Sequence, residues 1–215
     1  MPRRRAKLDA MQPATSLLRQ PLPQNAWLVH EPAFESSQAA DVRLARLLEE
    51  LAWEERSIEL FGRRILQPRL VAWAGEVAYR YSGQTLEPRR FTPAARELRD
   101  RVCDMTGQAF NHVLFNRYRD GNDSMGMHSD DESELGEAPT VASVSFGTAR
   151  RFVIVSKRRG DHFRRELELG HGALLVMGGR FQQAYRHGVP KQPRVAAQRV
   201  SATFRRLLRE PQVQG

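Results

Sequence analysis

One short segment, FNRYRDGNDSMGMHSDDE at residues 115–132, gathers the residue types from which metal sites are made. Within it, His128 and Asp130 are separated by a single serine. On an extended backbone, side chains two positions apart project to the same side, so this imidazole and carboxylate could bind one ion. A solvated acidic loop has the same composition. A third ligand from elsewhere in the chain is therefore needed to decide between the two interpretations.

The best candidate for that third ligand is His187, in the segment AYRHGVP. It follows an apolar run and precedes Gly-Val-Pro, which predicts a position at the end of a strand. Two histidines and one carboxylate form the facial arrangement of non-haem Fe(II) oxygenases, which leaves coordination positions open for reactants. Structural zinc usually takes cysteine or a fourth protein ligand, and the only cysteine, Cys103, lies in a predicted helix. The ligand set therefore favours iron.

A second group of candidate residues lies in RVSATFRR, near the C-terminus. Alternation places its polar side chains on one face of a strand: Arg199, Ser201, Thr203 and Arg205. Two arginines on one face could receive a dicarboxylate, because a guanidinium binds a carboxylate through two parallel hydrogen bonds. Asn116 and Tyr118 share a face of another predicted strand, VLFNRY, and could add an amide and a phenol. The alternative is a polar edge strand with its arginines in solvent.

The elements that must position these residues change in type along the chain. Helical periodicity predicts two helices: DVRLARLLEELAW, with Asp41 as N-cap, and TPAARELRDRVCDMTG, with Thr92 as N-cap and Gly107 past its end. After Asn111 the period changes to two, in β-rich runs separated by Gly, Pro and charged residues. These runs are NHVLFNRY, TVASVSFG, RRFVIVSK, GALLVMGG and RVSATFRR. They predict a double-sheet β core with helices packed against it.

Charge and composition narrow the class of protein. The chain has 215 residues, with 34 Lys and Arg against 25 Asp and Glu, for a formal net charge of +9. Most of the basic residues are arginine, which suits phosphate and indicates a nucleic-acid partner, although a GC-rich genome produces the same bias. No apolar run is long enough to span a bilayer and no secretory signal is visible. With a single cysteine, these features predict an intracellular, cytoplasmic protein.

Together, the motifs resemble those of the AlkB family of Fe(II)/2-oxoglutarate-dependent nucleic-acid dioxygenases, over roughly residues 62–206. The resemblance rests on QPRLVAWAGE, YRYSG, NRYRDGNDSMGMHSDDE, ASVSFG, HGALLVMGG, HGVPK and RVSATFR, in that order, and is closest to the subgroup with His-x-Asp-Asp-Glu. It implies an α+β, mainly β fold: a double-stranded β-helix (jelly-roll) core with flanking N-terminal helices and a nucleotide-recognition lid. We expect a flexible basic arm over 1–25, helices and lid over 26–110 and the core over 111–209, with 26–209 as one domain.

The resemblance also implies ligands for the metal and its co-substrate. His128, Asp130 and His187 would bind Fe(II) and form the catalytic centre. A second set would hold 2-oxoglutarate: Asn116, Tyr118, Arg199, Thr203 and Arg205. Within that set, Arg205 would pair with the distal carboxylate. Arg199 would lie closer to the metal-side carboxylate and to Asp130.

Five further residues would contact nucleic acid: Asp131, Tyr79, Tyr81, Glu132 and Arg69. Asp131 resembles the residue that contacts the exocyclic amine of the damaged base. Tyr79 and Tyr81 resemble aromatic residues of the lid and could stack on a base. The chain departs from the family pattern at Ser201-Ala202, where Asn-Leu is common. It also shows no apolar finger loop that would open a duplex.

The expected activity is oxidative demethylation of N-alkylated bases, such as 1-methyladenine and 3-methylcytosine, in DNA or RNA. It would use Fe(II), O2 and 2-oxoglutarate, release succinate, CO2 and formaldehyde, and serve the repair of DNA alkylation damage. We expect a monomer without a membrane partner, acting on single strands or on a base flipped out of a duplex. One alternative is a dioxygenase of the same architecture that acts on a protein or another non-nucleic-acid substrate. Another is a nucleic-acid-binding module whose metal site is vestigial.

Overall fold

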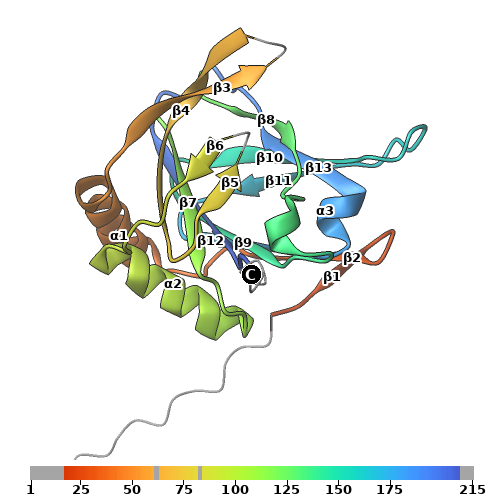
Figure 1. The fold of residues 1–215 in the computed structure, drawn as a ribbon, viewed down its shortest axis with the longest axis horizontal. Helices are drawn as coiled ribbons and strands as arrows, with labels where there is room; N and C mark the ends of the chain where they lie inside the picture. The colour runs from red at the N-terminus through yellow and green to blue at the C-terminus, as the bar shows by residue number, and fades with distance from the viewer. Residues whose placement is uncertain (1–16, 61–62, 82–83, 209–215) are drawn as a thin grey trace, which may run out of the picture.

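Two antiparallel β-sheets face each other in the computed structural model of the protein, which describes residues 17–60, 63–81 and 84–208 (Figure 1). Across the larger sheet, the strands are β1 (Gln20–Leu22), β2 (Ala26–Glu31), β12 (Ala173–Gly179), β9 (Val141–Gly147), β14 (Arg199–Arg205), β7 (His112–Tyr118), β4 (Arg63–Gly75) and β3 (Glu54–Leu60). Across the smaller sheet, they are β11 (Arg164–Leu169), β10 (Arg150–Ser156), β13 (Tyr185–Val189) and β8 (Met125–His128). Strands distant in sequence thus lie side by side, as in a double-stranded β-helix, and the predicted jelly-roll core is confirmed.

The alternation along β14 assigns its two faces to different environments. Val200, Ala202 and Phe204 are fully buried against the helix side of the larger sheet, where they pack in one cluster with Leu98 and Val102. Burying a side chain of the size of phenylalanine contributes about 1.5–3 kcal/mol to stability. The opposite face of β14 carries the polar residues and turns toward the smaller sheet. The strand therefore supports the core with one face and a polar cavity with the other.

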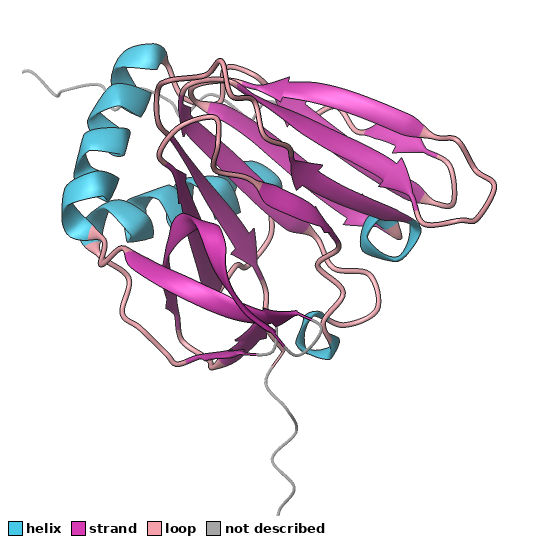
Figure 2. Cartoon of the chain, turned by 90° about the horizontal axis from the view of Figure 1, so that it is seen from above, coloured by secondary structure: helices cyan, strands magenta, loops and turns pink. Residues whose placement is uncertain are grey.

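Two helices cover the outer face of the larger sheet, as Figure 2 shows: α1 (Ser37–Glu50) and α2 (Pro93–Thr106). The second agrees with the prediction, since Thr92 caps its N-terminus and Gly107 ends it in the left-handed conformation. The first begins earlier than predicted. Ser36, not Asp41, is the N-cap, because its hydroxyl accepts the Ala39 N–H at 3.3 Å and the intervening residues continue the helix.

The N-terminal segment joins the larger sheet rather than forming an arm over its whole predicted length. Gln20–Leu22 form β1, which pairs with β2 in antiparallel register. Residues 1–16 of the predicted arm lie outside the described part of the chain. Among the described residues, no helix is both long and apolar enough to cross a membrane.

Two hairpins extend from the sheets near the site. The strands β5 (Tyr79–Tyr81) and β6 (Gln84–Leu86) form a small separate sheet between β4 and α2. The hairpin of β3 and β4 exposes Ile65 and Leu66, although the sequence suggests no apolar loop in this region. On the smaller sheet, a turn of 3-10 helix (Ser133–Leu135) follows β8 and the short helix α3 (Phe181–Ala184) precedes β13. These two segments flank the loop that carries Asp130.

Candidate metal centre

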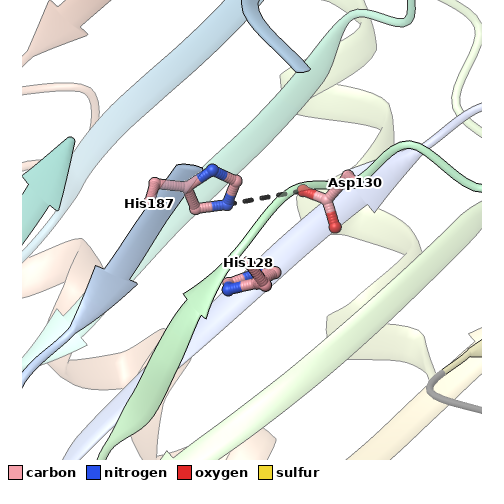
Figure 3. A group of neighbouring side chains, drawn as sticks. All are labelled: His128, Asp130 and His187. Atoms are coloured by element: carbon pink, nitrogen blue, oxygen red, sulfur yellow. Dashed lines mark ion pairs between the residues drawn. The ribbon is translucent and has the colours of Figure 1, made fainter. Parts of the chain in front are cut away.

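The three predicted metal ligands converge between β8 and β13 (Figure 3). His128 ends β8 and pairs in register with His187 on β13, which brings their ring centroids to 4.4 Å. Asp130 follows two residues later, and its Oδ2 lies 3.6 Å from Nε2 of His187. One nitrogen or oxygen from each of the three side chains lies within 4.8 Å of the others. The pairing of β8 with β13 therefore brings together ligands that lie 57 or more positions apart in the sequence.

The donor set fits a divalent cation. Nδ1 of His128 is 2.9 Å from the carbonyl oxygen of Gly126, so donation by Nδ1 leaves Nε2 free to bind a metal. Oδ1 of Asp130 accepts from Nη2 and Nε of Arg205 at 2.5 and 3.1 Å. The other oxygen, Oδ2, is buried and has no hydrogen-bond partner among the described residues. A buried carboxylate oxygen that faces two imidazoles and lacks a donor is suited to a cation.

Electrostatics keep these groups in the protonation states that a metal requires. Burial alone would raise the pKa of Asp130, but Arg205 and the two imidazoles outweigh it, and the pKa lies at about 2. Burial lowers the pKa of His187 to about 3, with the nearby positive charges adding to the effect. Burial also lowers the pKa of His128. A carboxylate and two neutral imidazoles are the forms that bind metal.

The loop that carries Asp130 is hydrogen-bonded to α3. Gln182, fully buried on this helix, accepts the Asp130 N–H through its side-chain oxygen at 3.0 Å. Ser129 Oγ donates to the carbonyl oxygen of Tyr185 at 2.9 Å. Phe152 stacks against the His187 ring at 5.2 Å between centroids. Sequence reasoning missed Gln182 and Phe152, since neither lies within a recognisable motif.

A small cavity, with about 30 Å3 of free volume, lies beside the three ligands, between the two sheets. Its walls include all five predicted co-substrate residues: Asn116, Tyr118, Arg199, Thr203 and Arg205. Sequence reasoning missed other lining residues on β9, β10, β12 and β13: Ser143, Phe152, Met177, Gly188 and Val189. Ser143 could have been found from the alternation in ASVSFG, which places it on the same face as Ser145.

The structure contradicts one predicted detail of the two arginines, the proximity of Arg199 to Asp130. Arg205, not Arg199, contacts Asp130, and it does so through two donors to one oxygen. Arg199 lies toward the other end of β14, where Nη2 donates to Ser145 Oγ at 2.8 Å and the guanidinium lies 5.2 Å from the centroid of the Tyr118 ring. Its Nε and Nη1 atoms are buried without a hydrogen-bond acceptor among the described residues. The two arginines lie at opposite ends of β14, since Arg205 pairs with His112 and Arg199 with Tyr118.

The predicted nucleic-acid residues differ in accessibility. Asp131 is exposed and forms an ion pair with Lys157 at 2.8 Å. Arg69 is buried and donates to Asn116 Oδ1 at 2.7 Å, so it positions a cavity residue. Tyr79 is fully buried, and burial together with the nearby carboxylates of Asp130 and Glu132 raises the pKa of its hydroxyl. In this conformation, Tyr79 therefore offers no face to a base. The backbone of Tyr81 pairs with Gln84, and its side chain lies outside the described part.

A buried histidine, His112, lies behind the site and gives stability a pH dependence. Burial, reinforced by the charge of Arg205, lowers its pKa to about 3 from the ordinary 6.5. Neither ring nitrogen has a hydrogen-bond partner among the described residues, and the ring meets Tyr79 edge-on at 4.9 Å. In the unfolded chain His112 is protonated below about pH 6.5, whereas in the folded chain it is protonated only below about pH 3. This residue therefore reduces stability as pH falls through that window and contributes no pH dependence above it.

Substituting His112→Phe is expected to remove one proton from this linkage without breaking a hydrogen bond. The free energy of unfolding of the metal-free protein should then fall less steeply between pH 6 and 4, by up to about 1.4 kcal/mol per pH unit. Urea unfolding across a pH series measures the slope. An unchanged slope would show that His112 is not held neutral in the fold.

Comparison with known proteins agrees with this architecture and site. The sequence pattern of the 2OG-Fe(II) oxygenase superfamily matches residues 27–205. Human alpha-ketoglutarate-dependent dioxygenase alkB homolog 3 is 39% identical over 188 residues, 84% of this chain and 66% of that protein. Mouse DNA oxidative demethylase ALKBH2 is 43% identical over 159 residues, 70% of this chain and 66% of that protein. The chain thus spans just under two thirds of the length of these curated relatives.

A solved structure shows the same fold at low sequence identity. The structure of OsALKBH1 superimposes with a TM-score of 0.62 at 15% identity, over 88% of this chain and 100% of that one. At this identity the likeness supports the fold alone. The superfamily pattern, by contrast, covers most of the chain, and the curated relatives carry the AlkB name. The chain belongs to the 2OG-Fe(II) oxygenase superfamily and, within it, to the AlkB family.

Proposed function

We propose that this chain is an Fe(II)- and 2-oxoglutarate-dependent dioxygenase that removes alkyl groups from N-alkylated bases of DNA or RNA. The observation that carries the proposal is the convergence of His128, Asp130 and His187 beside a buried cavity lined by arginine. Superfamily membership implies Fe(II) as the cofactor and 2-oxoglutarate and O2 as co-substrates. The relative named DNA oxidative demethylase supports the substrate class.

The ligand atoms follow from the hydrogen bonds already made. The iron would be held by His128 Nε2, Asp130 Oδ2 and His187 Nε2. The other candidate atoms of the first two residues, Nδ1 of His128 and Oδ1 of Asp130, already have hydrogen-bond partners in the protein. When bound, iron would supply oxidising chemistry in which O2 and 2-oxoglutarate are converted to succinate and CO2 while an N-methyl group is hydroxylated; the hydroxymethyl group would then be lost as formaldehyde, restoring the base. Arg205 keeps Asp130 ionised and fixes its orientation, so its role is in positioning the ligand.

Arg199, rather than Arg205, is the proposed partner of the distal carboxylate of 2-oxoglutarate. Arg205 binds Asp130, whereas two nitrogens of Arg199 are buried without an acceptor among the residues that the structure describes. A dicarboxylate entering the cavity would provide those acceptors and offset the burial of the guanidinium, which lowers its pKa. Tyr118, Asn116 and Thr203 line the same cavity and would complete the polar contacts.

The base would approach from the side of the β5–β6 hairpin and the loop after β8. Asp131 is exposed there and could accept a hydrogen bond from an exocyclic amine in exchange for its ion pair with Lys157. Chemistry on a base requires a single strand or a flipped nucleotide, since a paired base cannot reach an enclosed site. The formal charge of +9 supports a polyanionic substrate.

We also propose that the protein acts as an intracellular monomer in DNA alkylation repair. The three metal ligands and the cavity walls all come from one chain, so the site needs no second copy. The single cysteine, Cys103, is free and half-buried on α2, which suits a reducing compartment.

The decisive activity experiment measures succinate and demethylated base in the same reaction. With Fe(II), O2 and 2-oxoglutarate, oligonucleotides containing 1-methyladenine or 3-methylcytosine should give both products in equal amounts. His128→Ala should lose both, because two ligands do not hold the ion in the required geometry. Succinate without demethylated base would favour a different substrate. If neither product forms while oligonucleotide binding is retained, a binding module is the better explanation.

A further inference from the structure

A basic groove of about 480 Å3 lies on the surface where β4 ends and α2 begins. Four arginines line it: Arg89, Arg90, Arg96 and Arg99. Among the described residues that line it, Glu76 is the only acidic one. The groove is separate from the metal cavity, with which it shares no lining residue.

Two of the four arginines carry positive charge that no carboxylate offsets. Arg90 and Arg96 are exposed and form no ion pair with any described residue. The other two are paired, Arg89 with Glu54 at 2.9 Å and Arg99 with Asp100 at 2.7 Å. The groove therefore presents two free guanidinium groups to solvent, beside two that are already held in place.

Aromatic rings hold the paired arginines at fixed positions. The guanidinium of Arg89 lies 3.6 Å from the centroid of the Trp73 ring, and Trp73 is anchored by its Nε1, which donates to Glu87 O at 2.8 Å. Arg99 lies 4.7 Å from the centroid of the Phe91 ring. Stacking and ion pairing together fix these two side chains, so they form a rigid wall beside Arg90 and Arg96.

The groove lies at the base of the hairpin that covers the metal site. Gly75 and Arg89 exchange backbone hydrogen bonds of 2.8 and 3.0 Å, and the chain between them forms β5 and β6. Gly75 also pairs with His112, which pairs with Arg205 on the next strand. The backbone of Gly75, in the wall of the groove, therefore lies two strand spacings, about 10 Å, from the backbone of Arg205. Tyr79, on the hairpin itself, lies over the Arg205 guanidinium at 5.7 Å.

We propose that this groove binds the phosphodiester backbone of the nucleic-acid strand next to the target nucleotide. The inference rests on the proposed function, because it assumes that a base enters beneath the β5–β6 hairpin. A strand whose base is inserted there passes the base of the hairpin, where Arg90 and Arg96 meet its phosphates. Phosphate contacts fix the register of a strand without reading its sequence, so the groove would position substrates of any sequence.

The test replaces the two unpaired arginines and measures binding as a function of salt. In Arg90→Gln/Arg96→Gln, the slope of log K against log salt for a methylated single strand should decrease by about 0.7 for each lost phosphate contact. Fluorescence anisotropy of a labelled oligonucleotide gives this slope with the full chain. In turnover, KM for the strand should rise several-fold with kcat unchanged, because the contact is made equally in the ground state and the transition state.

The matched control is Arg180→Gln/Arg194→Gln. Both residues are exposed, form no ion pair with described residues and lie outside the groove. If the control pair changes the slope and KM as much as the groove pair, the arginines act only through net charge and the proposal is wrong. Equal slopes in wild type and groove variant would overturn it as well. Absence of demethylation by the wild-type protein would instead refute the proposed function, while the salt slope would still report on the groove.

Discussion

Asp130→Ala is expected to abolish metal binding and, in the same variant, to lower the free energy of unfolding by about 3–5 kcal/mol. The first effect follows because Oδ2 of Asp130 is the only carboxylate oxygen that faces His128 and His187 within the cluster. The second follows because the variant leaves the buried guanidinium of Arg205 without its ion pair, which has an N–O distance of 2.5 Å. Isothermal titration with Mn(II) and urea unfolding measure the two effects separately.

A double variant separates these two consequences. Asp130→Ala/Arg205→Met removes both charges, so it should recover most of the lost stability, because an apolar side chain replaces a buried cation that has lost its ion pair with Asp130. Metal binding should remain absent, since the ligand is still missing. If the double variant is as unstable as Asp130→Ala, Arg205 is not the group that Asp130 stabilises. If either variant binds metal with wild-type affinity, Asp130 is not a ligand.

Arg199→Met is expected to change co-substrate affinity and stability in opposite directions. Losing a buried, hydrogen-bonded partner of a carboxylate costs about 2–5 kcal/mol, which raises the dissociation constant of 2-oxoglutarate by about thirtyfold or more. In the ligand-free protein, Arg199 is a buried cation with two nitrogens that lack a partner in the described part of the chain, so its replacement should leave stability unchanged or increase it. Thermal unfolding with and without 2-oxoglutarate measures both quantities, because a ligand of the folded state raises the melting temperature.

The matched control for this variant is Arg186→Met, on the outward side of β13. Its side chain is exposed, so we expect less than about 0.5 kcal/mol of change in stability and no change in the dissociation constant of 2-oxoglutarate. A stabilised Arg199→Met protein with unchanged affinity for 2-oxoglutarate would contradict the proposed role of Arg199. If Arg205→Met loses affinity for 2-oxoglutarate while Arg199→Met keeps it, then Arg205 binds the distal carboxylate, as the family resemblance implies.

The sequence predicts the parts of the site that depend on local geometry. Alternation in RVSATFRR assigns Arg199 and Arg205 to one face, and the structure confirms that both line the cavity. The spacing of His128 and Asp130, with His187 at a predicted strand, likewise anticipates three side chains that the sheet pairing brings together. In these cases, the period of a strand is sufficient information.

The sequence does not predict what depends on how the sheets are arranged. Both arginines lie on the correct face of β14, but which end of the strand meets Asp130 depends on the register with β7 and on where the loop after β8 packs. Tyr79 illustrates the same limit, because an aromatic residue on a hairpin could face solvent or the interior. Here it packs against His112 and Arg205 and is fully buried.

Anomalous diffraction from crystals grown with Mn(II) and 2-oxoglutarate tests the ligand set most directly. One anomalous peak per chain is predicted within coordination distance of His128 Nε2, Asp130 Oδ2 and His187 Nε2, with a carboxylate of the co-substrate on the ion and the other on Arg199. A protein that binds no ion there, or an ion held by other side chains while His187 points away, would contradict the account.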